Sequence, residues 1–221
     1  MKFQIAIDGP AASGKTAVGR GVGKALKWNF LDTGIMYRAA TRSVLDSGIS
    51  FEEDSSIIET VKITSIELED FSGSEKILIN GIDKTSTLKT PEIDRTVSII
   101  SKIPEVRKEL VTQQRNIASQ GPIVMVGRDI GSVVLPDAEL KLYLDASVEA
   151  RAQRRYEEQV DFEDKLSLNE VKVDLERRDL LDTQRQDSPL RKNDFYTIID
   201  TTTMSLEDVI NEITSIYKSQ F

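Results

Sequence analysis

Apolar and polar positions along the chain alternate between strand-like and helix-like spacing over most of its length. Short apolar runs of strand length occur at residues 3–8, 29–32, 123–126, 140–144 and 196–199. Apolar residues at helical spacing follow most of these runs, over residues 16–27, 36–45, 148–159 and 168–186. Regular alternation of strands and helices predicts an α/β fold in which a parallel sheet is covered on both faces.

One stretch between the second and third of these strands has a different pattern. Apolar residues at 63–68 and 77–79 flank a turn-like segment at 71–74, and Asn80-Gly81 gives a second turn signal. This pattern is typical of paired antiparallel strands joined by tight turns. We therefore expect a small antiparallel β insertion over about residues 63–84.

Helix boundaries are also marked in the sequence. Helical periodicity resumes after Pro91 and again after Pro104, which is well suited to the first position of a helix. Gly121 is expected to cap the end of the second of these helices. Ser205, with Asp208 three residues later, resembles a capping box and predicts the start of a last helix.

Composition bounds the class of protein. The length of 221 residues fits a single α/β domain, and 39% hydrophobic with 30% charged residues is typical of a globular chain. No apolar run approaches the length of a membrane span. The start of the chain has one basic residue and then strand-like sequence, which does not resemble a secretory or transit signal. We expect a cytoplasmic protein with no membrane partner.

The residue types that are missing narrow the chemistry. The chain has no cysteine and no histidine, which excludes disulfides, thiolate nucleophiles and imidazole bases or ligands. Phosphoryl transfer suits the remaining side chains, because its catalysis is mostly positioning and charge stabilisation. A net charge of -8 argues against a nucleic-acid partner, whose binding normally needs a basic face.

The most specific motif is a phosphate-binding loop. Residues 9–16 match the Gly-x-x-x-x-Gly-Lys-[Ser/Thr] pattern, between a predicted strand and a predicted helix. In this pattern backbone N–H groups surround phosphate oxygens, Lys15 reaches the terminal phosphates and the Thr16 hydroxyl binds Mg²⁺. The alternative is an ordinary glycine-rich turn. The predicted ATP contacts are Gly9, Pro10, Ala11, Ala12, Ser13, Gly14, Lys15, Thr16 and Ala17.

Two further turns follow predicted strands at the carboxyl edge of the sheet, which they share with the phosphate loop. The segment from Asp32 to Arg38 brings a carboxylate, the Thr33 hydroxyl and a guanidinium to one turn, although Asp32 or Thr33 alone is equally suited to capping a helix.

The second of these turns carries Arg128 and Asp129, which directly follow another apolar strand. Arg128 can bind phosphate oxygens with two N–H groups. Asp129 can accept a proton or orient a hydroxyl, and the alternative for both is a surface turn.

Charged residues also recur at helical spacing. Arg151, Arg154 and Arg155 lie at i, i+3 and i+4, and Arg178, Asp182 and Arg185 at i, i+4 and i+7, so each set is predicted to share a helical face. The second set suits a phosphate with adjacent sugar hydroxyls. Solvated faces and exposed ion pairs give the same spacing and stay open as alternatives.

With these motifs assembled, the chain resembles the bacterial cytidylate kinases over nearly its whole length. The matching stretches are residues 5–15, 31–38, 97–98 with 104–107, 127–138, and 178–190. Five motifs in the same order are far more specific than the phosphate loop alone. The resemblance implies transfer of the ATP γ-phosphoryl group to CMP or dCMP, with Mg²⁺, in a small P-loop kinase fold.

The resemblance also implies roles for particular residues. The monophosphate-binding region would span about 33–107, extended by the insertion, and a short lid would span about 153–168 and close over the reacting groups. Ser98, Arg107 and Asp129 would lie at the cytosine. The acceptor phosphate and sugar would contact Thr33, Tyr37, Arg38, Arg128, Asp182 and Arg185. Arg151, Arg154, Arg155 and Arg178 would surround the transferring phosphoryl group, and Arg154 would also contact ATP. The catalytic residues would be Lys15, Arg128, Asp129, Arg151, Arg155 and Arg178.

Departures from the family pattern are mild. Thr33 replaces a serine, Ser132 stands where threonine is common, and Ile35 replaces an alanine. None removes a needed functional group, but they leave the use of UMP open.

We expect in-line transfer of the phosphoryl group without a covalent enzyme intermediate, and we expect the enzyme to be a monomer. Another P-loop kinase of small metabolites, such as a different monophosphate or shikimate, and a nucleotide-binding switch without phosphotransfer are the competing hypotheses.

Overall fold

The fold was analysed on a computed structural model that describes residues 3–71, 74–158 and 166–220. The chain divides into two compact units. We call residues 1–32 with 118–221 the sheet unit, and residues 33–117 the inserted unit. That the whole chain acts as a single kinase domain stays a prediction. Within the described residues, no helix has the length and apolar character that crossing a membrane requires.

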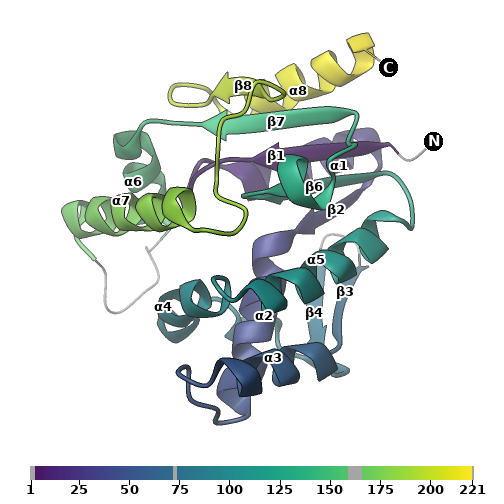
Figure 1. Cartoon of the computed structure of the whole chain (residues 1–221). Helices are drawn as coiled ribbons and strands as arrows, with labels where there is room; N and C mark the ends of the chain where they lie inside the picture. The colour runs from purple at the N-terminus through teal and green to yellow at the C-terminus, as the bar shows by residue number, and fades with distance from the viewer. Residues whose placement is uncertain (1–2, 72–73, 159–165, 221) are drawn as a thin grey trace. The chain divides into compact units, whose positions relative to one another are not determined.

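The sheet unit is built on five parallel strands in the order β2-β6-β1-β7-β8. In Figure 1, β7, β1 and β6 run side by side through this unit. The strands are β1 (Gln4–Asp8), β2 (Asn29–Asp32), β6 (Ile123–Gly127), β7 (Leu140–Asp145) and β8 (Thr197–Asp200). The parallel sheet predicted from the alternation of strands and helices is confirmed.

One face of this sheet is covered by α1 (Lys15–Leu26) and α8 (Leu206–Gln220), which also pack on each other. Alternate residues of the strands point to this face, and Ile5 and Ile7 of β1 meet Val18 and Val22 of α1 in a common hydrophobic core. The predicted start of the last helix at Ser205 is confirmed, because the Ser205 hydroxyl oxygen accepts a hydrogen bond from the Asp208 N–H at 3.2 Å.

A pair of helices, α6 (Val148–Glu157) and α7 (Leu168–Gln184), packs against the phosphate loop. Ala152 of α6 and Leu175 of α7 form a small apolar cluster with Ala11 of that loop. Helix α7 begins with a capping box between Ser167 and Glu170. The predicted lid falls partly on this pair, but residues 159–165 lie outside the described residues.

The inserted unit contains four helices and three short strands among its described residues. Helices α2 (Thr33–Asp46), α3 (Asp54–Ile63), α4 (Pro91–Ile100) and α5 (Pro104–Ala118) accompany a 3₁₀ turn at η1 (Thr85–Thr87). The antiparallel sheet has the order β3 (Ile66–Phe71), β4 (Ser74–Ile79) and β5 (Ile82–Asp83), which confirms the predicted β insertion. Prolines begin α4 and α5, as predicted.

Three local features differ from the sequence predictions. Helix α3 was not predicted. Gly121 does not cap α5, because the helix ends three residues earlier at Ala118 and Gly121 lacks the positive φ of such a cap. After β6 the chain forms a single π-helical segment, η2 (Ile130–Val134), in which the Leu135 N–H bonds the Ile130 carbonyl at 2.7 Å. π-Helical turns are rare and often occur at functional sites.

Candidate active site

The phosphate loop leaves the end of β1 and enters α1, as the motif predicts. Gly9 has φ 151° and packs so closely that a Cβ atom there would lie 2.2 Å from the Leu144 carbonyl oxygen. Gly14 has φ 87° and directly precedes the helix. Both positions therefore need glycine, the first for space and backbone and the second for backbone alone. The loop ends at a helix N-terminus, where backbone N–H groups favour anions.

Lys15 is buried in this loop. Its Nζ donates hydrogen bonds to the Pro10 carbonyl at 2.5 Å and to the Ser13 hydroxyl oxygen at 3.2 Å. Burial lowers the pKa of the Lys15 ammonium well below its ordinary value, and the positive charge of Arg128 adds to the fall. A polyanion bound at this loop would favour the charged form, because it supplies the negative charge that the buried ammonium lacks.

The Thr16 hydroxyl, on the first turn of α1, donates a 2.6 Å hydrogen bond to the Asp32 carboxylate at the end of β2. Strand β1, which leads through the phosphate loop into α1, and strand β2 are separated by β6 in the sheet. The contact therefore places a hydroxyl and a carboxylate beside the phosphate loop. Both are hard oxygen groups of the kind that Mg²⁺ prefers.

Arg128 follows β6 and pairs with Asp182 of α7. The Arg128 Nε donates to Asp182 Oδ2 at 2.7 Å, and both side chains are largely buried. Burial opposes the charged form of each, but the attraction between them dominates. The pKa of Arg128 is therefore raised above its ordinary value, and that of Asp182 is lowered. The structure thus brings together two predicted site residues that are 54 positions apart.

Asp129 and Arg185 form a second, looser pair, with 3.6 Å between Asp129 Oδ1 and Arg185 Nη2. We call Arg128, Asp129, Asp182 and Arg185 the acceptor cluster. The prediction that Arg185 shares a helical face with Asp182 is wrong, because α7 ends at Gln184 and Arg185 has an extended backbone. The chain turns back instead, and the Arg185 Nε donates to the Ser188 carbonyl at 2.6 Å.

The arginines of α6 contact different groups, although they lie at the spacing of one face. Arg151 is buried and donates to the Ala11 carbonyl at 3.2 Å while pairing with Asp179 at 2.7 Å. Arg154 instead donates to the Thr201 hydroxyl oxygen at 3.1 Å. Arg155 is more exposed and pairs with Glu158 at 2.8 Å. Arg178 of α7 lies near enough to Asp182 to help lower the pKa of that carboxyl.

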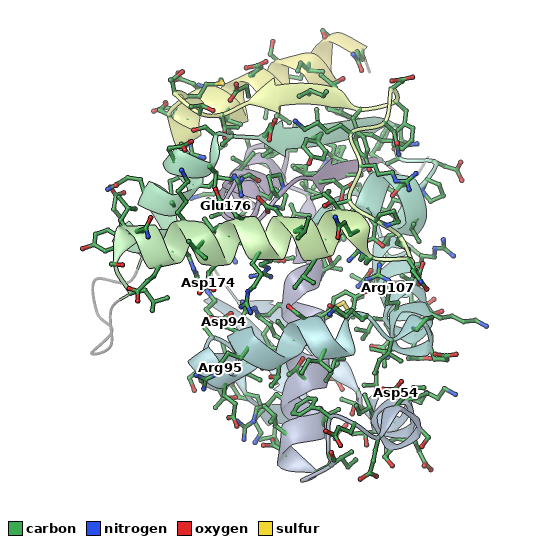
Figure 2. All side chains as sticks on the ribbon, turned by 60° about the vertical axis from the view of Figure 1, so that its left-hand side comes forward. Asp54, Asp94, Arg95, Arg107, Asp174 and Glu176 are labelled. Carbon is green, nitrogen blue, oxygen red and sulfur yellow. The ribbon has the colours of Figure 1, made fainter. Side chains whose placement is uncertain are left out.

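The inserted unit carries the remaining predicted site residues. Thr33 is buried at the start of α2 and Ser98 is half-buried on α4. Arg38 donates to the Leu88 carbonyl at 3.0 Å and pairs at 2.5 Å with Asp94, which Figure 2 labels on α4.

Arg107 is buried on α5, and its guanidinium lies over the Tyr37 ring with 5.6 Å to the ring centroid. It also donates to the Ser101 carbonyl at 3.3 Å. The structure therefore brings Tyr37 and Arg107 together within this unit, whereas Arg38 has its contacts elsewhere in it.

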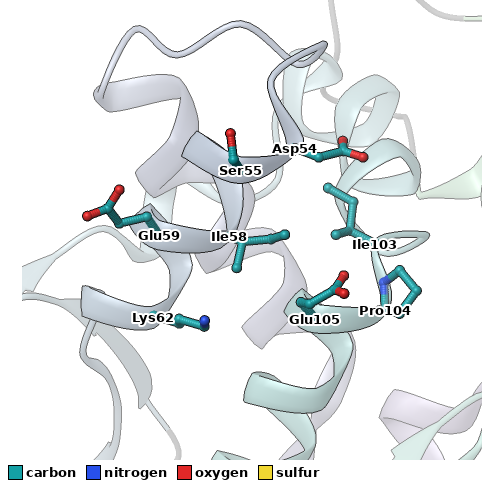
Figure 3. Close-up of a pocket in the computed structure, with 8 residues that line it drawn as sticks. All are labelled: Asp54, Ser55, Ile58, Glu59, Lys62, Ile103, Pro104 and Glu105. Atoms are coloured by element: carbon teal, nitrogen blue, oxygen red, sulfur yellow. The ribbon is translucent and has the colours of Figure 1, made fainter.

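A pocket of about 790 Å³ lies in the inserted unit and contains none of the predicted site residues. Figure 3 shows its walls, formed by α3 and the start of α5. Three of the lining side chains are carboxylates, on Asp54, Glu59 and Glu105, and Lys62 is the one cation among the eight lining residues. Across the described residues, no group of three or more acidic side chains is arranged to hold a metal ion. This pocket is therefore separate from the residues that are predicted to carry the chemistry.

Sequence reasoning missed two buried residues beside the phosphate loop. Asp8, the last residue of β1, is fully buried and accepts hydrogen bonds from two backbone N–H groups and a tyrosine. Thr201 accepts from Arg154 and donates to the Asp145 carbonyl. A charged residue at the end of an otherwise apolar strand was the available signal for Asp8. Thr201 follows a strand in the same way but has no distinctive neighbours.

The fold and these contacts together define a P-loop phosphotransferase. A family model described as cytidylate kinase matches residues 5–219 of the chain. A cytidylate kinase of Bacillus cereus is 41% identical over 220 residues, covering 100% of this chain and 98% of that protein. One from Bacillus thuringiensis is 40% identical with the same coverage. The chain belongs to the cytidylate kinase family.

A solved structure supports the fold alone. An uncharacterized protein from Eubacterium ventriosum aligns over 99% of both chains with a TM-score of 0.56 and 13% identity. Identity this low says nothing about substrate, so the family assignment rests on the full-length sequence relatives.

Proposed function

We propose that the chain transfers the γ-phosphoryl group of ATP to CMP or dCMP, giving ADP and CDP or dCDP. One observation carries the assignment of this reaction to particular residues. Asp8 of β1 pairs in register with Gly127 of β6, so the phosphate loop and the Arg128-Asp129 turn leave the sheet at the same level. Ligands of open α/β sheets bind at this carboxyl edge.

ATP would bind at the phosphate loop. Backbone N–H groups of residues 9–16 would surround the phosphates, and Lys15 would exchange its bond to the Pro10 carbonyl for one to a terminal phosphate oxygen. The hydrogen bond from Arg151 to the Ala11 carbonyl fixes the outer side of the loop. Arg154 would contact ATP from the α6 helix.

The residues present fit a magnesium ion. Mg²⁺ is usually bound in such sites by one or two protein oxygens together with substrate phosphates, which agrees with the Thr16 hydroxyl beside the Asp32 carboxylate. Thr16 would hold the ion that accompanies ATP, and Asp32 would orient the hydroxyl. The ion would supply positive charge at the β and γ oxygens.

The acceptor cluster would bind the monophosphate. Arg128 and Arg185 would hold the acceptor phosphate, because guanidinium groups can donate two N–H bonds to it. Asp182 would accept hydrogen bonds from the sugar hydroxyls, while its pairing with Arg128 keeps it ionised. Asp129 would orient the cytosine end of the acceptor.

Residues of the inserted unit are assigned through the family resemblance. Thr33, Tyr37 and Arg38 would contribute to phosphate and sugar recognition. Ser98 and Arg107 would recognise the cytosine. The packing of Arg107 over the Tyr37 ring supports this assignment in part, since it fixes the guanidinium of a buried arginine.

The transfer itself would be an in-line attack of an acceptor phosphate oxygen on the γ-phosphorus. The acceptor phosphate is largely ionised at neutral pH, so no strong base is needed. Lys15, Arg128, Arg151, Arg155 and Arg178 would balance the charge that develops on the transferring group.

Asp129 would orient groups rather than remove a proton. Asp129→Asn should then raise KM for CMP and leave kcat with the pH profile of the wild type. A kcat that falls steeply in one pH range would instead identify Asp129 as a base.

The reaction is tested by incubating the protein with ATP, Mg²⁺ and each nucleoside monophosphate in turn, and quantifying the diphosphates. We expect CDP and dCDP, and the same assay measures the use of UMP. Shikimate serves as the acceptor for the competing hypothesis. ATP binding without CMP-dependent ADP formation would overturn the proposed reaction.

We further propose that the enzyme acts in the cytoplasm and is a monomer. Its sedimentation behaviour would test the oligomeric state.

A further inference from the structure

Asp8 is a buried carboxylate that the proposed reaction does not use. It has no solvent exposure and lies at the carboxyl end of the central strand, one residue before the phosphate loop. Its side chain does not point into that loop. Oδ1 accepts from the Ile130 N–H and Oδ2 from the Gly131 N–H, both at 2.8 Å. These amides belong to the turn that carries Arg128 and Asp129.

A tyrosine completes this network. The Tyr196 hydroxyl donates to Asp8 Oδ2 at 2.8 Å, from the segment just before β8. Its ring packs so closely on the turn that a Cβ on Gly131 would lie 2.9 Å from the ring edge. Ser132, in the same turn, lies near enough to the Tyr196 hydroxyl to influence the pKa of that hydroxyl. The Ile130–Gly131 backbone is therefore held by the carboxylate and by the ring that bonds it.

The geometry of the turn explains why it needs such an anchor. Directly after Asp129 the chain enters the π-helical segment, and the Asp129 carbonyl accepts from both Val133 N–H at 2.8 Å and Val134 N–H at 3.2 Å. The N–H groups of the first π-helical residues have no partner within that segment. Asp8 supplies that partner for Ile130 and Gly131, and charged acceptors make stronger hydrogen bonds to N–H groups than neutral ones do.

We propose that Asp8, held by Tyr196, is a positioning residue that fixes the Ile130–Gly131 backbone and thereby sets Arg128 and Asp129 for acceptor binding. The inference deepens the proposed function and rests on it for the roles of Arg128 and Asp129. A buried carboxylate next to the ATP-binding loop thereby controls how tightly the other substrate, the phosphoryl acceptor, binds.

The ionisation of Asp8 supports this role at neutral pH. Burial raises the pKa of the Asp8 carboxyl to about 6, and the nearby Asp129 carboxylate adds to the rise. The Asp8 carboxylate in turn acts to raise the pKa of two groups that face it, the Lys15 ammonium and the Tyr143 hydroxyl. At pH 7 to 8 the carboxylate is therefore ionised and accepts all three bonds. Below about pH 6 a proton must occupy an oxygen that already accepts an N–H group.

The test compares Asp8→Asn with Tyr196→Phe and with the matched control Asp145→Asn. Asp145 also ends a strand of the same sheet, but its carboxylate pairs with Lys192 instead of a turn. Asparagine at position 8 keeps one acceptor and places an amide N–H₂ against the other N–H. We expect Asp8→Asn to weaken CMP binding about tenfold, since a hydrogen bond to a charged group has about that effect.

ATP binding, measured by calorimetry, should change less than threefold in Asp8→Asn. Tyr196→Phe keeps the ring and should show a smaller effect of the same kind, and Asp145→Asn should show none. The ratio of the CMP KM values of Asp8→Asn and wild type should be largest at pH 7 to 8 and narrow below pH 6. Because both enzymes share the substrate, titration of its phosphate cancels in this ratio.

Hydrogen exchange separates this inference from the proposed function, because it needs no turnover. The amides of Ile130 and Gly131 should exchange faster in Asp8→Asn, with little change over residues 9–16. Equal losses of CMP and ATP binding, or faster exchange with unchanged CMP affinity, would overturn the positioning role. Absence of CMP phosphorylation by the wild type would instead overturn the proposed function, whatever the exchange shows. Should Asp8→Asn fail to fold, Tyr196→Phe carries the same test.

Discussion

The phosphate loop holds its shape through backbone conformation, whereas the acceptor cluster beside it is held by charge. In the loop, Gly9 and Gly14 adopt positive φ and Lys15 bonds the loop's own Pro10 carbonyl. In the cluster, Arg128 and Asp182 depend on each other across 54 positions of the chain. The loop is therefore a local structure that a short motif encodes, and the cluster exists only once the sheet unit has folded.

This difference has consequences for mutation. Removing a side chain from the loop should change chemistry and leave stability nearly intact, because the backbone holds the shape. Removing one from the cluster leaves a buried charge without its partner, so stability and acceptor binding should fall together.

The largest effect is expected for Lys15→Ala. Loss of a positive charge at the transferring group should lower kcat by about 10²–10³-fold, with CMP binding nearly unchanged. Steady-state kinetics with a coupled assay of ADP measures the first and calorimetry the second. Lys24→Ala, at an exposed position of the same helix, is the matched control. A loss of stability as large as the loss of activity would contradict the local character of the loop.

Arg128→Ala should come next, with two effects at once. It leaves Asp182 largely buried without its partner, which should lower the free energy of unfolding by about 1–3 kcal/mol and weaken CMP binding by about 10–100-fold. Urea denaturation followed by circular dichroism measures the stability. The control is Arg177→Ala, whose pair with Asp174 at 3.4 Å is largely exposed and should contribute less than about 0.5 kcal/mol. Equal losses of unfolding free energy in the two variants would refute the distinction between the buried pair and the exposed pair.

Arg185→Ala should raise KM for CMP about tenfold and leave KM for ATP within about twofold, since one charge-assisted contact to the acceptor is lost. Initial rates at varied concentrations of each nucleotide measure this split. Arg191→Ala, exposed in the same segment, should change neither KM. Parallel increases in both KM values would mean that Arg185 does not belong to the acceptor side.

The smallest effect concerns acid stability. Because Arg128 lowers the pKa of Asp182 below its ordinary 3.8, their pairing contributes stability above about pH 4 that is lost as pH falls through the lowered value. Asp182→Asn should therefore show a flatter decline of unfolding free energy below pH 4 than the wild type. Asp174→Asn, at an exposed pair, should follow the wild-type curve. Identical slopes for wild type and Asp182→Asn would remove the pair as a source of acid sensitivity.

The comparison also explains what the sequence could predict. Strands, the phosphate loop and the β insertion depend on patterns within a few residues, and they were predicted correctly. Helix α3 was missed because its residues Ile57, Ile58, Thr60 and Val61 are β-branched, which weakens a helical pattern. The roles carried over from the family stay predictions that the variants above test.

Predictions that depend on where the chain turns, or on residues far apart in the sequence, failed for a different reason. The i+7 argument for Arg185 assumed that the helix continues to position 186, whereas the chain leaves α7 at Gln184 and turns at Ser188, which has φ 49° and precedes a proline. The role of Asp8 depends on donors 122 to 188 positions away. No local pattern encodes partners at such separations, so only the folded sheet unit reveals them.

The strand order also has a consequence during protein synthesis. The central strand β1 pairs only with β6 and β7 in the described sheet, which begin at Ile123 and Leu140. At translation rates of about 5–20 residues per second, the apolar stretch from Phe3 to Ile7 therefore waits on the order of ten seconds for its partners. The inserted unit is continuous in sequence and leaves the ribosome complete before then. A newly made chain thus carries its first strand unpaired while most of the remaining protein is still being translated.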